Sequence, residues 1–261
     1  DMQSVFDELY ENSLAKCEFK NLISIITAEE NIRLAYRNLK KNAGSRTPGT
    51  DGKTIADLAK MSEPELIGFV QQKFNWYQPQ SVRRKEIPKG NGKTRPLGIP
   101  TIMDRLIQQC VLQVMEPICE AKFCETSNGF RPNRGVENAL AQAEKHMQKS
   151  NLHIVIDIDI KGFFDNVNHG KLLRQIWAMG IHDKKLLSII SAMLKAEVAG
   201  IGFPEKGTPQ GGILSPLLSN IVLNELDWWI TSQWVGMPTR HEYSGKIHEN
   251  GTKDQSQSIG S

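Results

Sequence analysis

Apolar residues recur at the spacing of a helix over much of the chain. This spacing predicts a helix over 28–40, and Thr27-Ala-Glu-Glu30 at its start has the sequence of a capping box. A second capping box, Ser62-Glu-Pro-Glu65, predicts a helix whose apolar side consists of Leu66, Phe69, Val70 and Phe74. A third helix follows a cap formed by Thr101 and Asp104, and its inward-facing residues are Ile107, Val111, Val114 and Ile118.

The C-terminal half predicts four more helices. They cover 136–149, 169–179, 183–196 and a stretch that follows a Gly-rich turn at 207–212. Pro216 falls in the first turn of the last helix, where proline is well tolerated. The stretches 45–54 and 127–135 are rich in glycine, proline or asparagine and are predicted loops. The residues 236–261 are polar and lack apolar periodicity, which predicts a flexible tail.

Two stretches have the pattern of β-structure. Residues 83–100 predict a hairpin, with short extended runs on either side of Lys89-Gly-Asn-Gly-Lys93. Residues 152–160 predict a strand, because isoleucines alternate there with other residues at a period of two. Helices interspersed with a few strands make the expected fold class α+β.

The strand over 152–160 combines an apolar face with an acidic one. Alternation places Asp157 and Asp159 on the same side, and Ile154, Ile156, Ile158 and Ile160 on the other. The isoleucine face needs a hydrophobic layer, whereas two carboxylates on one face repel each other unless water or a cation separates them. Mg²⁺ is a cation that suits carboxylate oxygens and substrate phosphates. An acidic sheet face open to solvent is the alternative, and the strand alone does not decide between them.

Composition places the chain among water-soluble globular proteins. It has 261 residues, of which 39% are hydrophobic and 23% are charged, enough for one large domain or two small subdomains. An apolar run of 18 residues is absent from the sequence, so we expect no membrane span. The four cysteines form no Cys-x-x-Cys pair, which favours reduced thiols in the cytoplasm over a zinc site.

The positive charge of the chain is concentrated in one block. The net charge is only +3, but residues 71–105 hold eight lysines and arginines against Glu86 and Asp104. Such a block suits a polyanion, namely nucleic acid or nucleotide phosphate, and a solvated surface loop is the alternative. The turn 207–212 adds flexible backbone just before a helix N-terminus, which favours an anion. Together with the acidic strand, these are three parts of a phosphoryl-transfer site.

Four segments occur in the order found in one known family. They read IPKGNGKTRPLGIPTIMDRLIQQ, SNGFRPNRG, DIDIKGFFDNVNH and GTPQGGILSPLLSNIVLNELD. In this the chain resembles the reverse transcriptases encoded by bacterial group II introns, over roughly residues 12–235. The four segments are specific to that family as a set, although each alone is not.

The resemblance implies a right-hand polymerase fold with an antiparallel palm sheet packed on helices and a helical N-terminal extension. The expected divisions are the extension at 1–60, fingers at 61–150, palm at 151–235 with finger elements interleaved, and the tail. It also implies RNA-directed DNA synthesis and assistance to the splicing and mobility of the intron. The implied partners are group II intron RNA, an RNA template with a DNA primer, and deoxynucleoside triphosphates, in the bacterial cytoplasm; a homodimer is compatible with the pattern.

The resemblance also implies roles for individual residues. Asp159 would bind the catalytic metal, with the backbone carbonyl of Ile160 beside it, and Phe164 would stack under the nucleotide sugar. Gln210 would touch the incoming nucleotide, and Lys89 and Arg95 would grip its triphosphate. The family uses two Mg²⁺ ions. From the basic block and the loop at 127–135 we expect RNA contacts by Arg83, Arg84, Lys93 and Arg131.

The sequence departs from the family at one point. The aromatic-x-Asp-Asp turn that supplies the second pair of metal ligands is absent, because these 261 residues contain no Asp-Asp pair. After Asp227 the remaining acids are Glu242, Glu249 and Asp254 in the tail. We therefore expect the chain to be a fragment, comprising fingers and part of the palm, that binds RNA but is incomplete for catalysis.

Two rival interpretations stay open. A non-catalytic RNA-binding module on a polymerase scaffold would explain the missing Asp-Asp pair. A metal-dependent glycosyltransferase would explain Asp157-Ile-Asp159 as an Asp-x-Asp sequence, but it leaves the basic hairpin without a role. Primer extension on an RNA template separates the first from a polymerase, and turnover of a sugar nucleotide would identify the second.

Overall fold

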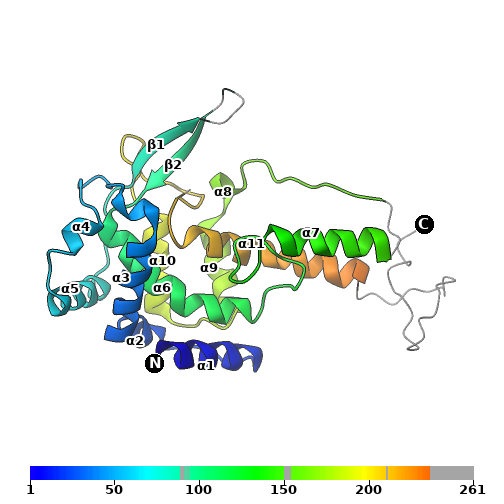
Figure 1. Cartoon of the computed structure of the whole chain (residues 1–261), viewed down its shortest axis with the longest axis horizontal. Coiled ribbons are helices and arrows are strands. Elements are labelled where there is room, and N and C mark those ends of the chain that lie inside the picture. The colour runs from blue at the N-terminus through cyan, green and yellow to red at the C-terminus, as the bar shows by residue number, and fades with distance from the viewer. Residues whose placement is uncertain (89–91, 93, 150–153, 210, 236–261) are drawn as a thin grey trace. The chain divides into compact units, whose positions relative to one another are not determined.

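The computed structural model describes residues 1–88, 92, 94–149, 154–209 and 211–235 (Figure 1). These residues form two compact units. The first unit contains residues 1–122 and 162–221, and the second contains 123–161 together with residues from 222 onward. The units follow from packing alone, so the expected division into extension, fingers and palm stays a prediction.

Helices make up most of the first unit. In chain order they are α1 (Met2–Leu14), α2 (Leu22–Ile26), α3 (Glu29–Lys41), the 3₁₀ turn η1 (Ala43–Arg46), α4 (Ile55–Leu58), α5 (Glu63–Asn75), α6 (Ile102–Glu120), α8 (Phe163–Asn166), α9 (His169–Ala178) and α10 (Lys184–Leu194). Helix α11 (Ser215–Ile230) begins in this unit. The expected helices at 28–40, 169–179 and 183–196 are confirmed within two residues.

Helix α6 is the centre of the first unit. It packs against α1, α2 and α3, and Ile107, Val111, Val114 and Ile118 are fully buried, as the spacing predicts. A buried polar contact joins α6 to α3, because Gln113 donates to the Asn31 carbonyl oxygen at 2.7 Å and to its side-chain oxygen at 2.6 Å. The Asn31 amide in turn donates to the Cys110 carbonyl. These bonds satisfy buried polar groups and fix how the two helices align.

Two of the three predicted helix caps are confirmed and one is wrong. Thr101 is the N-cap of α6 and accepts a hydrogen bond from the Asp104 N–H, and Ser62 opens α5 in a capping box with Glu65. The predicted box at Thr27 does not form, because α3 begins at Glu29 with Ala28 as its N-cap. The Thr27 hydroxyl donates instead to the Ile23 carbonyl at 2.8 Å, so it closes α2 rather than opening α3.

The predicted hairpin is present. Strands β1 (Arg83–Pro88) and β2 (Thr94–Ile99) pair antiparallel, with Arg83 opposite Ile99 and Pro88 opposite Thr94. The hairpin extends away from the helices of the first unit (Figure 1). It is the one sheet within the described residues, so the palm sheet expected from the resemblance is not formed there.

The second unit is described by helices and one extended segment. Helix α7 (Val136–Glu144) continues into the π-helical turn η2 (Lys145–Lys149), which confirms the helix expected at 136–149. The C-terminal part of α11 from Val222 onward lies in this unit and continues into the π-helical turn η3 (Thr231–Val235). The expected tail over 236–261 lies outside the described residues.

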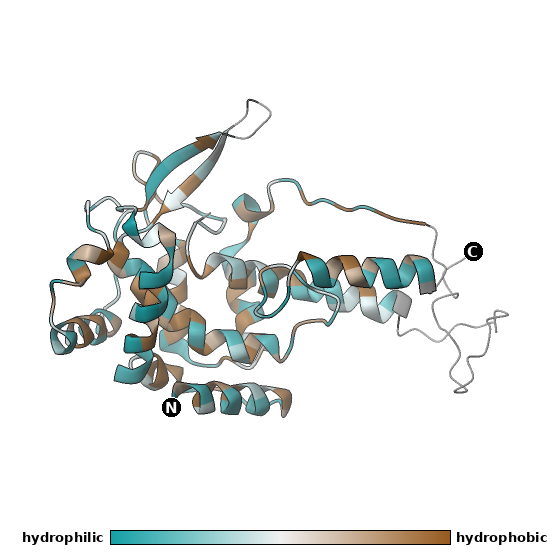
Figure 2. Ribbon diagram, viewed as in Figure 1, coloured by the Kyte–Doolittle hydropathy of each residue, from teal (hydrophilic) through white to brown (hydrophobic). Residues whose placement is uncertain are grey.

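The predicted strand over 152–160 is not a strand where the structure describes it. Residues 154–160 are exposed and have no ladder partner, and both hydrophobic and hydrophilic residues occur along them (Figure 2). The isoleucines do recur at a period of two, but a strand exists only through hydrogen bonds to a neighbouring strand. Among the described residues no second strand lies beside 154–160, and its isoleucines remain uncovered.

None of the helices within the described ranges is long and apolar enough to span a membrane.

Candidate functional site

Three segments that are distant in sequence line one cleft of the first unit. Its volume is about 210 Å³. The hairpin contributes Arg84, Pro96 and Gly98, and the α8 segment contributes Asp165. The third segment runs from the end of α10 to the turn before α11 and contributes Leu194, Ala196, Val198, Ile201, Pro204 and Lys206–Pro209. The structure thus brings the predicted basic hairpin and the predicted Gly-rich turn to the same cleft.

The turn before α11 is fastened to the segment around α8. The Gly207 N–H donates to the Val167 carbonyl at 2.7 Å, and the Thr208 N–H donates to the Phe164 carbonyl at 2.8 Å. The side chain of His169 bonds to the Gly207 carbonyl through Nε2 at 2.7 Å. Gly207 has a φ of +94°, and a β-carbon there would lie 3.0 Å from the Phe164 carbonyl oxygen. Glycine is therefore needed for this close approach of two backbone segments.

The same turn also touches the hairpin. Gly211 has a φ of +110°, and a β-carbon there would collide with the carbonyl oxygen of Gly98 in β2. Gln108 of α6 accepts a hydrogen bond from the Ile213 N–H at 2.8 Å, which anchors the start of α11 to the core helix. The turn before α11 is thus held against the α8 segment, strand β2 and helix α6.

The hairpin brings arginine to the cleft. Arg84 is exposed and forms an ion pair with Glu86 on the same strand, at 2.7 Å from Nη2 to the carboxylate. An exposed pair of this kind contributes little to stability and leaves the guanidinium able to exchange partners. Arg83 is half-buried, and its Nε is buried without a hydrogen-bond partner among the described residues.

Lys206 is a cleft residue that the sequence analysis did not single out. Its ammonium group donates to the side-chain oxygen of Asn166 at 2.9 Å. Asn166 is positioned in turn, because its amide donates to the Gly162 carbonyl. The partners are forty positions apart, so no local pattern in the sequence could have indicated this cation.

Several predicted site residues fall outside the described residues. This applies to Lys89, Lys93 and Gln210, and to the side chain of Arg95, whose backbone lies in β2 opposite Ile87. Phe164 is described: its ring is half-buried and packs edge-on against Phe163 with centroids 5.7 Å apart, while its carbonyl holds the Gly-rich turn. Its expected contact with a nucleotide sugar stays a prediction.

The expected metal ligands lie on the exposed segment of the second unit. Asp157 and Asp159 are two residues apart on extended backbone, and the Ile160 side chain is exposed as well. Such oxygens suit Mg²⁺. No group of three or more metal-ligating side chains occurs among the described residues, and no backbone ladder holds the two carboxylates in place. The donor set found in these ranges is therefore incomplete for a metal centre.

Arg131 has a structural role in the second unit. It is buried, donates to the carbonyls of Cys124 and Ser127 at 2.8 and 2.9 Å, and lies over the ring of Phe123. These contacts shape the loop that the sequence predicted at 127–135. The expected RNA contact of Arg131 stays a prediction.

Comparison with known proteins supports the resemblance seen in the sequence. Residues 87–248 match the family model for reverse transcriptase (RNA-dependent DNA polymerase). Among curated proteins, Protein YkfC of Escherichia coli strain K12 is 35% identical over 231 residues, which cover 85% of this chain and 60% of YkfC. The group II intron-encoded protein LtrA of Lactococcus lactis subsp. cremoris is 38% identical over 240 residues, which cover 87% of this chain and 38% of LtrA.

A solved structure has a similar fold. A chain of a partial Cas6-RT-Cas1–Cas2 complex superposes with a TM-score of 0.51 and 22% sequence identity, and the match covers 82% of this chain and 35% of that one. At this identity the likeness concerns the fold alone. The chain spans 60% of YkfC and 38% of LtrA, so the activities of those whole proteins are not transferred by the match itself.

Proposed function

The chain belongs to the reverse transcriptase (RNA-dependent DNA polymerase) family, and from this we propose that it forms the template- and nucleotide-binding part of a group II intron-related RNA-directed DNA polymerase. The observation that carries the proposal is the cleft between the hairpin, the α8 segment and the Gly-rich turn. Its backbone is fixed by hydrogen bonds, and its rim carries the side chains of Arg84 and Lys206. Such a rim suits a triphosphate.

Within this proposal each part of the cleft has one task. Arg84, Lys89 and Arg95 of the hairpin neutralise phosphate charge together with Lys206 of the turn before α11. The turn containing Gln210 approaches the nucleotide closely because it is built on glycines. Phe164 follows Asp159 by five residues and is proposed to limit the space beside the sugar to a deoxyribose.

The proposal assigns Mg²⁺ to the carboxylate of Asp159 and the carbonyl of Ile160. Bound Mg²⁺ would neutralise the reacting phosphate and activate a hydroxyl. The sequence has no Asp-Asp pair, and the described residues hold no other carboxylate group that completes a metal site. We infer that polymerisation needs ligands beyond Asp157 and Asp159, and that these 261 residues bind template and nucleotide without extending a primer.

The proposed partners follow from the family. An RNA template with a DNA primer and deoxynucleoside triphosphates are the substrates, and intron RNA is a further partner, as the name of LtrA suggests for that relative. A non-catalytic RNA-binding module is the second candidate. The unpaired segment 154–160 and the missing Asp-Asp pair favour it.

A binding experiment tests the cleft directly. Binding of a labelled deoxynucleoside triphosphate, with a primed RNA template present, is measured for the wild-type chain and for Arg84→Ala/Lys206→Ala. We expect the double variant to bind at least tenfold more weakly, because two cations at the phosphate are removed. Lys195→Ala is the matched control, since this exposed lysine lies between cleft residues Leu194 and Ala196 but is not in the lining. Equal affinity in both variants would exclude the cleft as the nucleotide site.

Primer extension with Mg²⁺ tests the missing ligands. The wild-type chain should give no extension product, while Asp159→Ala should leave RNA affinity within about twofold of wild type because phosphate contacts dominate binding. A chain extended through an Asp-Asp hairpin should extend the primer, and lack of activity there would favour the non-catalytic module. Templated extension by the 261-residue chain, abolished by Asp159→Ala, would show that its own residues complete the metal site.

A further inference from the structure

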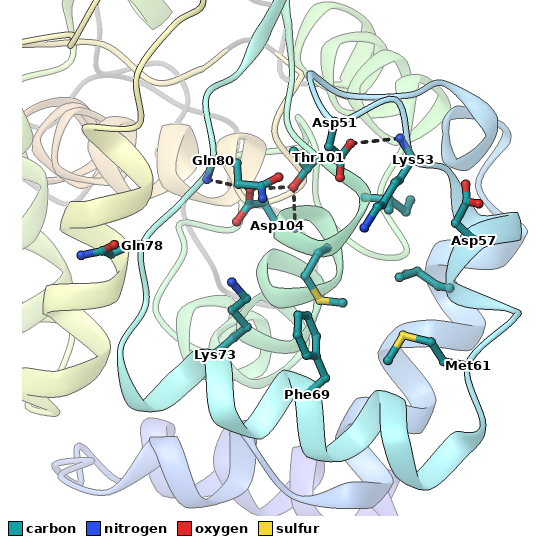
Figure 3. Close-up of a pocket in the computed structure, with 13 residues that line it drawn as sticks. Asp51, Lys53, Asp57, Met61, Phe69, Lys73, Gln78, Gln80, Thr101 and Asp104 are labelled. Carbon is teal, nitrogen blue, oxygen red and sulfur yellow. Dashed lines mark hydrogen bonds between the residues drawn. The ribbon is translucent and has the colours of Figure 1, made fainter.

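A second cavity lies in the first unit, away from the cleft. Its volume is about 440 Å³, and we call it the α4–α5 pocket because residues of these two helices line it, with the N-terminal turn of α6 (Figure 3). Leu58, Met61, Phe69 and Met103 supply its apolar surface. Phe69 is 39% exposed, so its ring faces the opening rather than the core. The pocket and the cleft have no lining residue in common.

Two lysines flank this apolar surface. Lys53 comes from the loop before α4 and Lys73 from the last turn of α5, and both side chains extend toward the pocket (Figure 3). The Lys73 ammonium lies 5.4 Å from the centre of the Phe69 ring and also interacts electrostatically with the buried Asp104. An aromatic ring beside a cation is a surface on which a flat base can stack.

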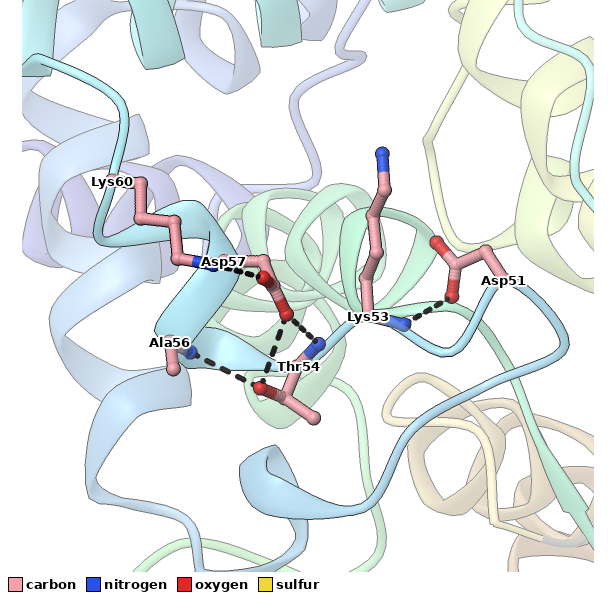
Figure 4. A network of polar contacts seen from close by, with 6 residues as sticks. All are labelled: Asp51, Lys53, Thr54, Ala56, Asp57 and Lys60. Carbon is pink, nitrogen blue, oxygen red and sulfur yellow. Dashed lines mark hydrogen bonds and ion pairs between the residues drawn. The ribbon is translucent and has the colours of Figure 1, made fainter.

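The carboxylates around the pocket are engaged elsewhere. Asp57 accepts hydrogen bonds from the Thr54 backbone at 3.0 Å and from the Lys60 ammonium at 2.8 Å (Figure 4). Asp51 accepts from the backbone N–H of Lys53 at 3.1 Å, which shapes the loop that presents the lysine (Figure 4). These bonds engage Asp51 and Asp57 locally, and the ammonium groups of Lys53 and Lys73 form no ion pair with either carboxylate.

The wall of the pocket beside α6 is rigid. Asp104 is buried and accepts hydrogen bonds from Tyr77 at 2.9 Å, from the Gln80 backbone at 3.1 Å and from the Thr101 hydroxyl at 2.7 Å. This network ties the segment 76–80 to α6. Trp76 leads into that segment, three residues beyond Lys73, and its indole is 79% exposed. A large exposed aromatic side chain three positions along the chain from the lining residue Lys73 is a platform for a second base.

We propose that the α4–α5 pocket binds one unpaired base of an RNA strand against Phe69 and Met61, with Lys53 and Lys73 holding the adjoining phosphates. A base inside an A-form duplex presents no free face to such a pocket, so the strand must be unpaired there. The exposed Trp76 favours a strand with several bases over a free nucleotide. The inference rests on RNA being a partner of the chain, as the proposed function has it, but it concerns a different surface.

The test compares two single strands of equal charge. One is a labelled oligo-riboadenylate of about 12 nucleotides, a length within the usual site size, and the other is its abasic ribose-phosphate counterpart. Fluorescence anisotropy gives the affinity of each for the wild-type chain, Phe69→Ala and Lys53→Ala/Lys73→Ala. Tyr10→Ala is the matched aromatic control, because Tyr10 is 38% exposed on α1 against 39% for Phe69. Lys40→Ala/Lys41→Ala is the matched cation control on α3.

The pocket predicts a different result for each variant. Phe69→Ala should weaken binding of the oligo-riboadenylate about tenfold and leave the abasic strand unchanged. Lys53→Ala/Lys73→Ala should weaken both strands, and the slope of log affinity against log salt should shrink by about 0.7 for each phosphate that the variant no longer neutralises. The control variants should stay near wild type, and circular dichroism checks that all variants are folded.

Three outcomes would overturn the inference. If Phe69→Ala weakens both strands equally, or no more than Tyr10→Ala does, no base enters the pocket. If the lysine variant matches its α3 control, the pocket holds no phosphate. If the wild-type chain binds neither strand, the RNA partnership of the proposed function fails as well, whereas tight wild-type binding with unaffected pocket variants removes the pocket alone.

Discussion

At the scale of single residues, the buried carboxyl of Asp104 should make the free energy of unfolding depend on pH. Burial raises the pKa of this carboxyl and outweighs the hydrogen bonds from Thr101, Tyr77 and Gln80, which lower it. The folded chain therefore holds the proton more tightly than the unfolded chain. The resulting stability is fully present below the unfolded pKa of about 3.9 and is lost as pH rises through the raised folded pKa.

The measurement is the free energy of unfolding from pH 4 upward for the wild type and Asp104→Asn. We expect the advantage of the wild type to shrink as pH rises, because asparagine carries no ionisable proton. Asp57→Asn should show the opposite trend: the Lys60 hydrogen bond lowers the pKa of Asp57, so its contribution is lost as pH falls. A constant difference between wild type and Asp104→Asn would contradict the assignment.

Gly211 is the residue through which the turn before α11 meets the hairpin. Alanine there must adopt a positive φ and also push against the Gly98 carbonyl and the Leu97 side chain. We expect Gly211→Ala to cost clearly more than the 1–2 kcal/mol typical of positive φ alone, about 3 kcal/mol by denaturant unfolding. Gly52→Ala supplies the comparison, since Gly52 has a φ of +72° and nothing within 4 Å of the added carbon. Similar losses in both variants would mean that the turn moves freely off β2.

At the scale of elements, the start of α6 should matter more than the start of α5. The Thr101 hydroxyl is buried and exchanges two hydrogen bonds with Asp104, whereas Ser62 is exposed at the start of α5. Thr101→Ala should cost about 2 kcal/mol and Ser62→Ala about 0.5–1 kcal/mol, because only the first leaves buried groups unpaired. Thermal unfolding of the two variants gives the order, and a larger loss for Ser62→Ala would be the contrary result.

These elements also show how far the sequence alone reaches. The hairpin, α5 and α6 were predictable because turn glycines, caps and apolar spacing all act within a few residues. The strand predicted over 152–160 is absent where the structure describes it, since pairing depends on a partner that the local pattern does not reveal. The predicted capping box at Thr27 is wrong for a related reason: the Thr27 hydroxyl bonds to the Ile23 carbonyl of α2 instead of capping α3. In the cleft, the hydrogen bond from Lys206 to Asn166 joins residues forty positions apart, so it could not be predicted from the local sequence.

At the scale of the whole molecule, the first unit is assembled from both sides of residues 123–161. Residues from the two parts bond directly: the Phe19 N–H donates to the Gly180 carbonyl and the His182 N–H to the Phe19 carbonyl, each at 2.8 Å. The Val82 N–H donates to the Glu197 carbonyl at 2.7 Å. A break in the chain between the two parts should therefore leave the first unit held together by its packing.

Lys161 offers the site for such a break. It is exposed and follows the unpaired extended residues 154–160, the conformation that a protease needs in its substrate. Brief native digestion with trypsin should give products ending at Lys161 and beginning at Gly162, identified by mass spectrometry, and Lys161→Gln should abolish them. The two products should elute together in size-exclusion chromatography. Slow cleavage would show that 154–160 is paired in solution, and separation of the products would contradict a first unit built from both parts. A strand added to the chain that pairs with 154–160 should protect Lys161, because a paired strand no longer fits a protease.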